Sequence, residues 1–509
     1  MQNQLKKCLL TTLAAALTVR VVYGVLFSAT ELAAFNSIKG LDMDTLLSFS
    51  EWNTSIPASA PMFVLHRFML FFLYMLCGGA HNFMLIYIAQ ALAGTAASVC
   101  AAWSVWMLSK NIRTAFTAGI IYALYGPFLL YESVALQEAV LTHTLTIGFA
   151  FYVWFVKSGR ISAGVTAGLI LGMNSAGRPA TAFLAIVLAL LPFVKERKFA
   201  LKNFSVPCAI AAVWLTASLF NGHFRGNYSP FFNVMPHLVE LHAPQSAAAT
   251  PAGGFSSTFR VLWGAIKNVP QLFGMREIPE NLDYDVIRQI LPILSLGPLL
   301  VMPFAISGAA AAAAMKRKEF LLLCITCGAL LLPLAARIPI GRYRLMLMPF
   351  FIAFAAIFIT ELIENSRRRA ALICIVIGVL GTNMLLASPL VRPNPAAHHT
   401  FALAAIKRGT DPAKHLEKAW ELSGHTYKSS GLMLVLQYLK KSDFSSAEKI
   451  ISQDKSNSAE FTYYLALVRI AQNRLPEANS LLQQIREPEK LGELYPKYLK
   501  LVSFVNSRI

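Results

Sequence analysis

Charged residues are scarce in this sequence. Asp, Glu, Lys and Arg make up 14% of the 509 residues, whereas hydrophobic residues make up 56% and the mean hydropathy is +0.54. Soluble domains carry about a quarter charged residues. The composition therefore excludes an ordinary soluble protein and predicts an integral membrane protein.

Acidic residues are fewer than basic ones, 26 against 45, which gives a formal net charge of +19. Many of the Lys and Arg residues occur in short clusters between apolar runs. Such clusters orient membrane spans, because loops rich in Lys and Arg stay in the cytoplasm. We therefore expect membrane lipids, and not nucleic acid, as partners of this chain.

Cysteine is also rare. All seven cysteines fall inside apolar stretches, so none is placed to cross-link an exported domain. Cys324 and Cys327 form a CxxC motif, but it lies within an apolar run without a His or acidic neighbour. We therefore interpret Cys324 and Cys327 as small packing residues and not as a redox or metal site.

Apolar runs of about 20 residues predict helical spans. The first run, at 8–29, follows Lys6 and Lys7 and is read as a retained helix with a cytoplasmic N-terminus. An all-α polytopic protein with about eleven spans is predicted. The others lie at about 83–108, 114–131, 139–156, 161–177, 180–194 and 204–220, before Lys316, on either side of 337–344, and at about 370–388.

The run at 62–77 is shorter and is interrupted by His66 and Arg67. We predict a helix at the outer face that does not cross. With this choice the basic clusters fall inside, except Arg178 and the group at 337–344. The topology places loops 30–82 and 221–290, and everything after span 11, outside the cytoplasmic membrane.

The composition turns polar after residue 390, which divides the chain into a membrane domain at 1–390 and an exported α-helical domain at 391–509. Pro393-Asn394-Pro395 is read as a linker. Segments 443–448 and 474–479 resemble each other and lie 31 residues apart, near the tetratricopeptide period of 34. Such repeats dock envelope proteins; a plain helical cap is the alternative.

Asp42 and Asp44 in the first outer loop are the candidate catalytic carboxylates. One of them can accept a proton from an acceptor hydroxyl or amine. Capping of a helix that starts near Thr45 is the alternative for either.

Glu132 and Glu138 are predicted in the second outer loop, where a carboxylate could orient the acceptor, bind a divalent metal or cap a span. Arg178 precedes Pro179 at a hairpin and either takes part in binding or lies at the membrane interface.

The segment Arg337-Ile-Pro-Ile-Gly-Arg342-Tyr343-Arg344 concentrates guanidinium groups in one outward turn. Guanidinium groups bind phosphate oxygens in a bidentate manner, as a lipid phosphate or diphosphate would require. General anchoring to anionic headgroups is the alternative. Lys267, in the long outer loop, could reach the same phosphate.

Taken in order, these motifs resemble the GT-C glycosyltransferases, in their bacterial branch of dolichyl-phosphate-mannose protein mannosyltransferases and the lipid A aminoarabinose transferase. The matching pieces are Leu41-Asp42 with Ser50, Ala60-Pro61-Met62-Phe63, Leu124-Tyr125-Gly126-Pro127 with Tyr131-Glu132, Gly168 to Gly172 with Arg178-Pro179, Lys267, Glu277-Ile278-Pro279-Glu280-Asn281 with Tyr284, and Gly341-Arg342-Tyr343-Arg344 ahead of Pro349.

The resemblance implies inverting transfer of a sugar from a polyprenyl-phosphate donor to an extracytoplasmic lipid, glycan or protein acceptor. Asp42 matches the position of the family's base, with Asp44 as its neighbour. Glu277, Asn281 and Tyr343 join the substrate-binding set through the same match. Two other functions stay open from the residues alone: a polyprenyl-lipid transporter or flippase, and an envelope scaffold.

Overall fold

The computed structural model describes residues 2–38, 47, 64–176, 179–196, 200–225, 268–269, 272–274, 283–291, 295–314, 320–335, 341–365, 372–373, 375–381, 394–454 and 458–508. The chain forms two compact units. The membrane unit comprises Met1–Thr30, Lys39–Ile278 and Ile287–Val391, and the C-terminal unit comprises Glu31–Ile38, Pro279–Val286 and Arg392–Ile509. The fold is all-α, as predicted.

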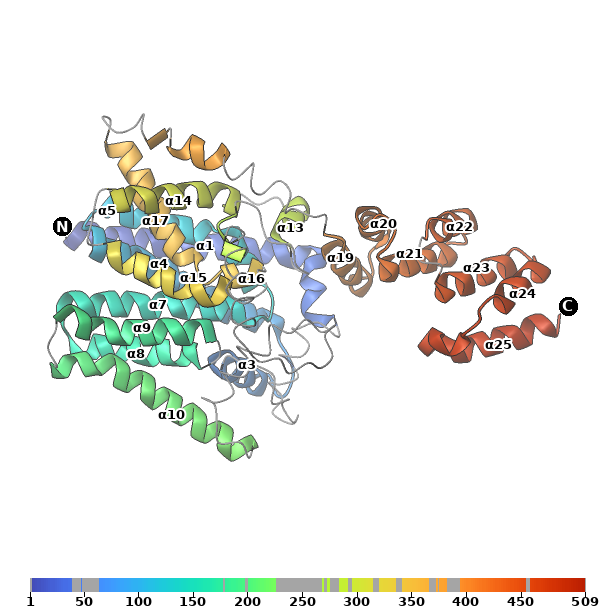
Figure 1. The fold of residues 1–509 in the computed structure, drawn as a ribbon, viewed down its shortest axis with the longest axis horizontal. Coiled ribbons are helices and arrows are strands. Elements are labelled where there is room, and N and C mark those ends of the chain that lie inside the picture. Colours follow the sequence, from blue (N-terminus) through green and yellow to red (C-terminus); the bar gives the residue numbers. More distant parts are fainter. Residues whose placement is uncertain are drawn as a thin grey trace, which may run out of the picture. The chain divides into compact units, whose positions relative to one another are not determined.

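Helices make up the membrane unit (Figure 1). They are α1 (Gln2–Ala29), α3 (Val64–Leu76), α4 (Phe83–Ser109), α5 (Ile112–Leu124), α6 (Gly126–Glu132), α7 (Gln137–Ser158), α8 (Ile161–Ser175), α9 (Pro179–Glu196), η2 (Leu201–Phe204), α10 (Ser205–Arg225), α14 (Pro298–Ala314), α15 (Leu321–Ala335), α16 (Gly341–Arg344) and α17 (Met348–Glu364). A further helix, α13, covers Tyr284–Ile290.

The helices pack in a chain of neighbours. α1 lies against α4 and α5, α17 against α5 and α14, α7 against α4 and α8, and α8 against α9 and α10. α17 is buried along most of its length, whereas α1 leaves Leu13, Leu17 and Val21 exposed. An apolar side chain that faces outward along a long apolar helix is suited to lipid contact.

α8 and α10 approach closely through a row of glycines. Gly164, Gly168 and Gly172 recur every four residues and therefore share one face of α8. A methyl group on Gly168 would lie 2.6 Å from the Val206 carbonyl oxygen of α10. Small residues at this spacing let membrane helices pack backbone to backbone.

Within the described residues, three helices are long and apolar enough to cross a membrane: α1, α4 and α7. They coincide with the predicted spans at 8–29, 83–108 and 139–156. Shorter apolar helices fall in five other predicted spans, at Ile112–Leu124, Ile161–Ser175, Ala180–Val194, Pro298–Ala313 and Leu321–Ala335. The total of eleven stays a prediction, and most of the span at 370–388 lies outside the described residues.

The predicted outer-face helix is α3. Its 13 residues would extend about 20 Å at 1.5 Å per residue, which is short of the roughly 30 Å of a hydrocarbon core. α5, which lies in a predicted span, also has 13 residues, so the position of α3 at the outer face stays a prediction.

The continuous span predicted at 114–131 is wrong: the chain breaks into α5 and α6 at Tyr125, which is extended. Pro127 has no N–H to continue the helical ladder. The freed backbone groups pair with Leu296, whose carbonyl accepts from the Gly126 N–H at 2.9 Å and whose N–H donates to the Leu124 carbonyl at 2.8 Å. The break redirects the chain before Glu132.

The C-terminal unit is built from successive short helices. They are α19 (Pro395–Arg408), α20 (Ala413–Leu422), α21 (Lys428–Lys440), α22 (Phe444–Ser452), α23 (Ala459–Ala471), α24 (Leu475–Gln483), η5 (Pro488–Leu494) and α25 (Tyr495–Asn506). The two similar segments begin α22 and α24, and their alanines Ala447 and Ala478 are fully buried. The tetratricopeptide assignment itself stays a prediction.

The linker predicted at 393–395 is in part a helix start. The Asn394 side chain accepts from the Ala397 N–H at 3.2 Å, and Pro395 is the first residue of α19. Asparagine at the cap and proline in the first turn are favoured helix-start residues. Pro393 lies outside the described residues.

Two segments from the predicted membrane domain, Glu31–Ile38 and Pro279–Val286, belong to the C-terminal unit. The 3-10 helix η1 (Glu31–Ser37) packs on α19, where the Phe35 and Phe401 rings are 5.3 Å apart. Asn394 Nδ2 donates to Asp283 Oδ2 at 3.1 Å. Segments that share one packed unit lie on one side of a membrane, which agrees with the common side predicted for both outer loops and the C-terminal domain.

Phe401 joins η1 to α19 and is 1% exposed. We expect Phe401→Ala to destabilise the C-terminal unit by about 3–5 kcal/mol, the usual cost of removing a buried Phe. Hydrogen exchange of the α19 amides in the full-length protein measures this. Ile406→Ala, on the same helix but 39% exposed, is the control and should cost less than about 1 kcal/mol. Equal protection in both variants would contradict the packing role.

Candidate functional site

The sequence predicts Glu132 in the second outer loop, and this prediction is wrong. Glu132 lies at the end of α6, and its side chain is 0% exposed. The turn that follows, through Ser133 and Val134 to α7, is buried as well. The break at Tyr125 places this carboxylate inside the bundle, where an isolated charge is costly.

The Glu132 charge is neutralised by Arg20 of α1. Arg20 Nη2 donates to Glu132 Oε1 at 2.7 Å, and the Arg20 side chain is 1% exposed. Arg20 Nη1 also donates to the Ala16 carbonyl at 3.2 Å, and the Tyr87 hydroxyl donates to the Arg20 carbonyl. The pair connects α1 with α6 and is fixed by α4.

His143 of α7 extends this pair. Its Nε2 lies 2.8 Å from Glu132 Oε1, a hydrogen-bond distance although the ring is not aligned for an ideal bond. Its Nδ1 lies 2.9 Å from the Tyr122 hydroxyl, which is 3.1 Å from Thr146 Oγ1. A polar chain therefore runs Arg20–Glu132–His143–Tyr122–Thr146 through an apolar bundle. We name it the buried relay.

The buried relay requires a glycine on α4. A methyl group on Gly94 would lie closer than 3.0 Å to both Glu132 Oε1 and Arg20 Nη2. Gln90, one turn earlier and fully buried, donates to the Val134 carbonyl at 2.9 Å and so holds the turn after Glu132. The α4 face is shaped to receive the ion pair.

The relay lies well inside the bundle. At 1.5 Å per residue, Arg20 lies about 14 Å before the end of α1. Gly94 lies about 16 Å after the start of α4. Ionisable residues at such depth in apolar helices mark proton pathways, substrate sites or helix-locking pairs. Glu132 Oε2 and Arg20 Nε are buried with no hydrogen-bond partner among the described residues, so the relay has unused polar capacity.

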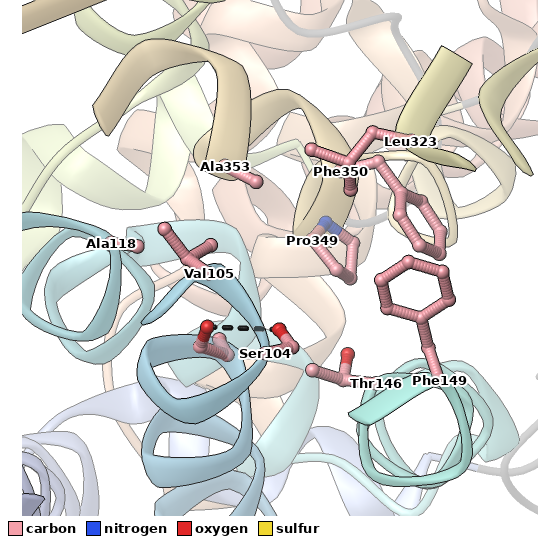
Figure 2. Close-up of a pocket in the computed structure, with 10 residues that line it drawn as sticks. Ser104, Val105, Ala118, Thr146, Phe149, Leu323, Pro349, Phe350 and Ala353 are labelled. Atoms are coloured by element: carbon pink, nitrogen blue, oxygen red, sulfur yellow. Dashed lines mark hydrogen bonds between the residues drawn. The ribbon is translucent and has the colours of Figure 1, made fainter. Parts of the chain in front are cut away.

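Thr146 carries the relay to a small cavity between α4, α5, α7, α15 and α17 (Figure 2). Its volume of about 10 Å³ suits roughly one water molecule. Phe149 and Phe350 meet edge to face across it, with centroids 5.0 Å apart, and Ser104 Oγ donates to the Ala101 carbonyl at 3.0 Å. The cavity is too small for a sugar.

Glu138 lies in the first turn of α7 and is 2% exposed. A carboxylate there interacts favourably with the helix dipole, which agrees with the capping alternative. Among the described residues, no group of three or more His, Cys, Asp or Glu side chains is placed to hold a metal ion.

The arginine turn is the second candidate feature. Arg344 is 1% exposed, and its Nη1 donates to the Gly274 carbonyl at 2.8 Å. Arg342 is half-buried, and its guanidinium lies 5.7 Å from the centroid of the Tyr343 ring. Both precede α17, whose first-turn amides at Phe350 and Phe351 are already bonded to the Leu347 carbonyl. These two amides are therefore not available to an anion.

Seven predicted site residues lie outside the described residues. They are Asp42, Asp44, Arg178, Lys267, Glu277, Asn281 and Arg337. The structure brings Glu132 together with two residues that the sequence reasoning missed, Arg20 and His143. Arg20 did carry a signal, since it is a lone charge in the middle of the first apolar run.

No family model and no curated protein matches this chain. Among solved structures, ArnT from Cupriavidus metallidurans bound to undecaprenyl phosphate has a TM-score of 0.45 at 14% identity, over 94% of this chain and 80% of that chain. The archaeal oligosaccharyltransferase AglB from Archaeoglobus fulgidus, in complex with an inhibitory peptide and a dolichol-phosphate, has a TM-score of 0.37 at 12% identity. The match covers 78% of this chain and 56% of AglB. These similarities are to the helical arrangement alone.

We expect Gly94→Ala to lower the stability of the membrane unit by about 1–3 kcal/mol, because the added methyl displaces the Arg20–Glu132 pair. Gly328→Ala is the matched control, since a methyl group there meets nothing within 4 Å; it should be neutral or slightly stabilising. Thermal unfolding of both variants in detergent is the measurement. A Gly94→Ala protein as stable as Gly328→Ala would refute the close packing.

The Arg20–Glu132 pair should behave as one unit in a double-mutant cycle. Arg20→Met and Glu132→Gln should each cost about 3–5 kcal/mol, because each leaves a buried polar partner, and the double variant should cost less than their sum. SDS-induced unfolding in mixed micelles measures the four proteins. The exposed pair Arg113–Glu364, 3.2 Å apart, is the control and should show about 1 kcal/mol or less. Strictly additive costs at Arg20 and Glu132 would exclude coupling.

Proposed function

We propose that this chain is an inverting glycosyltransferase that moves a sugar from a polyprenyl-phosphate donor to an extracytoplasmic acceptor. The observation that carries the proposal is the arginine turn: one half-buried and one buried guanidinium, two positions apart in the sequence, just before the largely buried helix α17. A lipid-borne phosphate needs fixed cations beside an apolar surface, and this turn supplies both.

The cations suit the leaving group of the reaction. As the sugar–phosphate bond breaks, its electron pair goes to the phosphate oxygen, and negative charge grows there. Guanidinium groups held before that step stabilise the charge without having to reorganise. The Gly274 carbonyl that accepts from Arg344 fixes the orientation of that side chain.

Asp42 is proposed as the base. Its carboxylate takes the proton from the acceptor hydroxyl or amine while the acceptor heteroatom attacks the anomeric carbon, and the polyprenyl phosphate departs from the opposite face. The proton ends on Asp42 and the configuration inverts. Asp42 follows Ile38 by four positions in the sequence, directly after the η1 segment that packs on α19.

The buried relay has a positioning role in this proposal. It ties α1 to α6 and α7, and α1 leads into the loop that carries Asp42. Glu132 is enclosed by Arg20 and His143, so we assign it to holding the helices and not to contact with the acceptor.

A transporter for a polyprenyl lipid is the second candidate, and the buried relay is the observation that favours it. Linked ionisable and hydroxyl side chains inside a membrane domain are the material of proton pathways in transporters. Such a protein would use the arginine turn for the phosphate and would need no base at Asp42.

Replacement of Asp42 separates the two functions. We expect Asp42→Asn to lower transfer by roughly 100-fold or more, the usual contribution of a general base, while binding of a polyprenyl monophosphate by the purified protein is retained. Asp44→Asn is the matched control and should keep most of the activity. Mass spectrometry of polyprenyl-linked sugars and envelope glycans, in cells that lack the protein and carry each variant, gives the readout.

Arg342→Gln should show the opposite pattern, with weakened binding of the polyprenyl monophosphate. Normal glycans in the Asp42→Asn strain, together with altered glycans in the Arg342→Gln strain, would support the transporter instead.

A further inference from the structure

A second, larger cavity lies at the other end of α7. It has a volume of about 320 Å³ and is enclosed by the end of α7, the end of α9 and η2. The lining residues are Tyr152, Phe155, Val156, Lys157, Ser158, Gly159, Leu191, Pro192, Lys202 and Asn203. This volume is within the range of small-molecule sites.

The cavity is distinct from the candidate site. Along α7, His143 of the buried relay and Ser158 of the cavity rim are separated by about 22 Å at 1.5 Å per residue. The cavity is also on the opposite end of the bundle from the predicted outer loops, at the end where Lys157 and Arg160 indicate the cytoplasm.

The walls of the cavity divide into two kinds. Phe155, Val156, Leu191 and Pro192 are apolar, and Tyr152 is fully buried with its hydroxyl donating to the Leu188 carbonyl at 2.7 Å. The rim is polar and cationic. There the Lys157 side chain is exposed, and Lys202 extends over Gly159, where an added methyl group would lie 4.0 Å from Lys202 Nζ.

Tryptophan and basic side chains mark this end as the level of the membrane interface. Lys110 Nζ lies 4.4 Å from the centroid of the Trp106 ring, and the Arg160 guanidinium lies 5.7 Å from that of Trp154. Trp103 of α4 and Trp154 of α7 are 5.5 Å apart, so the two helix ends are together. Aromatic and basic residues gather where lipid headgroups lie.

We propose that this cavity binds the phosphate headgroup of an anionic membrane lipid, with the lysines on the phosphate and the apolar wall against the start of the acyl chains. Basic pockets between membrane helices on the cytoplasmic side suit such headgroups. The proposal does not depend on the glycosyltransferase assignment.

Native mass spectrometry of the full-length protein in detergent tests the proposal. Phosphatidylglycerol, phosphatidylcholine and glycerol 3-phosphate are titrated separately, because they distinguish an anionic lipid from a neutral one and from a soluble phosphate. We expect phosphatidylglycerol adducts to dominate. Lys157→Gln and Lys202→Gln should each weaken phosphatidylglycerol binding about fivefold, since each cation near a membrane surface contributes about 1 kcal/mol.

Lys110→Gln is the matched control, because it removes a cation at the same end that does not line the cavity; it should change binding less than about twofold. Val156→Trp, which fills the apolar wall, should weaken binding without a change in charge. If the Lys202 variant fails to fold, Lys157→Gln and Val156→Trp still decide the matter. Equal loss with Lys110→Gln, equal binding of phosphatidylcholine, or equally tight binding of glycerol 3-phosphate would overturn the proposal.

Discussion

The pairing of Arg20 with Glu132 is the constraint on which the membrane unit depends. Either charge alone inside an apolar bundle would cost several kcal/mol, so neither helix can hold its position without the other. The pair can form only because Gly94 leaves room for it on α4 and because α6 ends where Glu132 can reach α1. Replacement of both charges by apolar groups need not destabilise a protein, so the pair fixes the register of the helices more than it adds stability.

The break between α5 and α6 is what makes this pairing available. A continuous helix through residue 131 would carry Glu132 out toward the membrane surface, where its carboxylate could not pair with the buried Arg20. Pro127 prevents that helix, and Leu296 satisfies the exposed backbone groups through two hydrogen bonds. The backbone restriction at Pro127 thus determines where the Glu132 carboxylate lies.

The sequence allowed the helical class and the long apolar helices α1, α4 and α7 to be predicted, because hydropathy acts over single segments. It did not allow the buried relay to be predicted, since Arg20 and His143 are 123 positions apart and meet only through packing. The sequence shows Arg20 as a lone charge in a predicted span. It does not show that Arg20 pairs with Glu132. The packing of Phe35 against Phe401 could not be predicted for the same reason. The helical positions of Ala447 and Ala478, in contrast, could be predicted from the local sequence pattern.

The two sets of arginines differ in what they can offer a substrate. Arg20 is enclosed, and Glu132 already neutralises it. An incoming phosphate would have to displace the Glu132 carboxylate, which would then be a buried charge without its partner. Arg342 retains exposure and lies against Tyr343, while Arg344 is held by a neutral carbonyl of Gly274. A cation that is already paired with a carboxylate loses most of its attraction for another anion. The buried relay is therefore poorly suited to bind a phosphate, and we assign it to holding α1, α6 and α7 together.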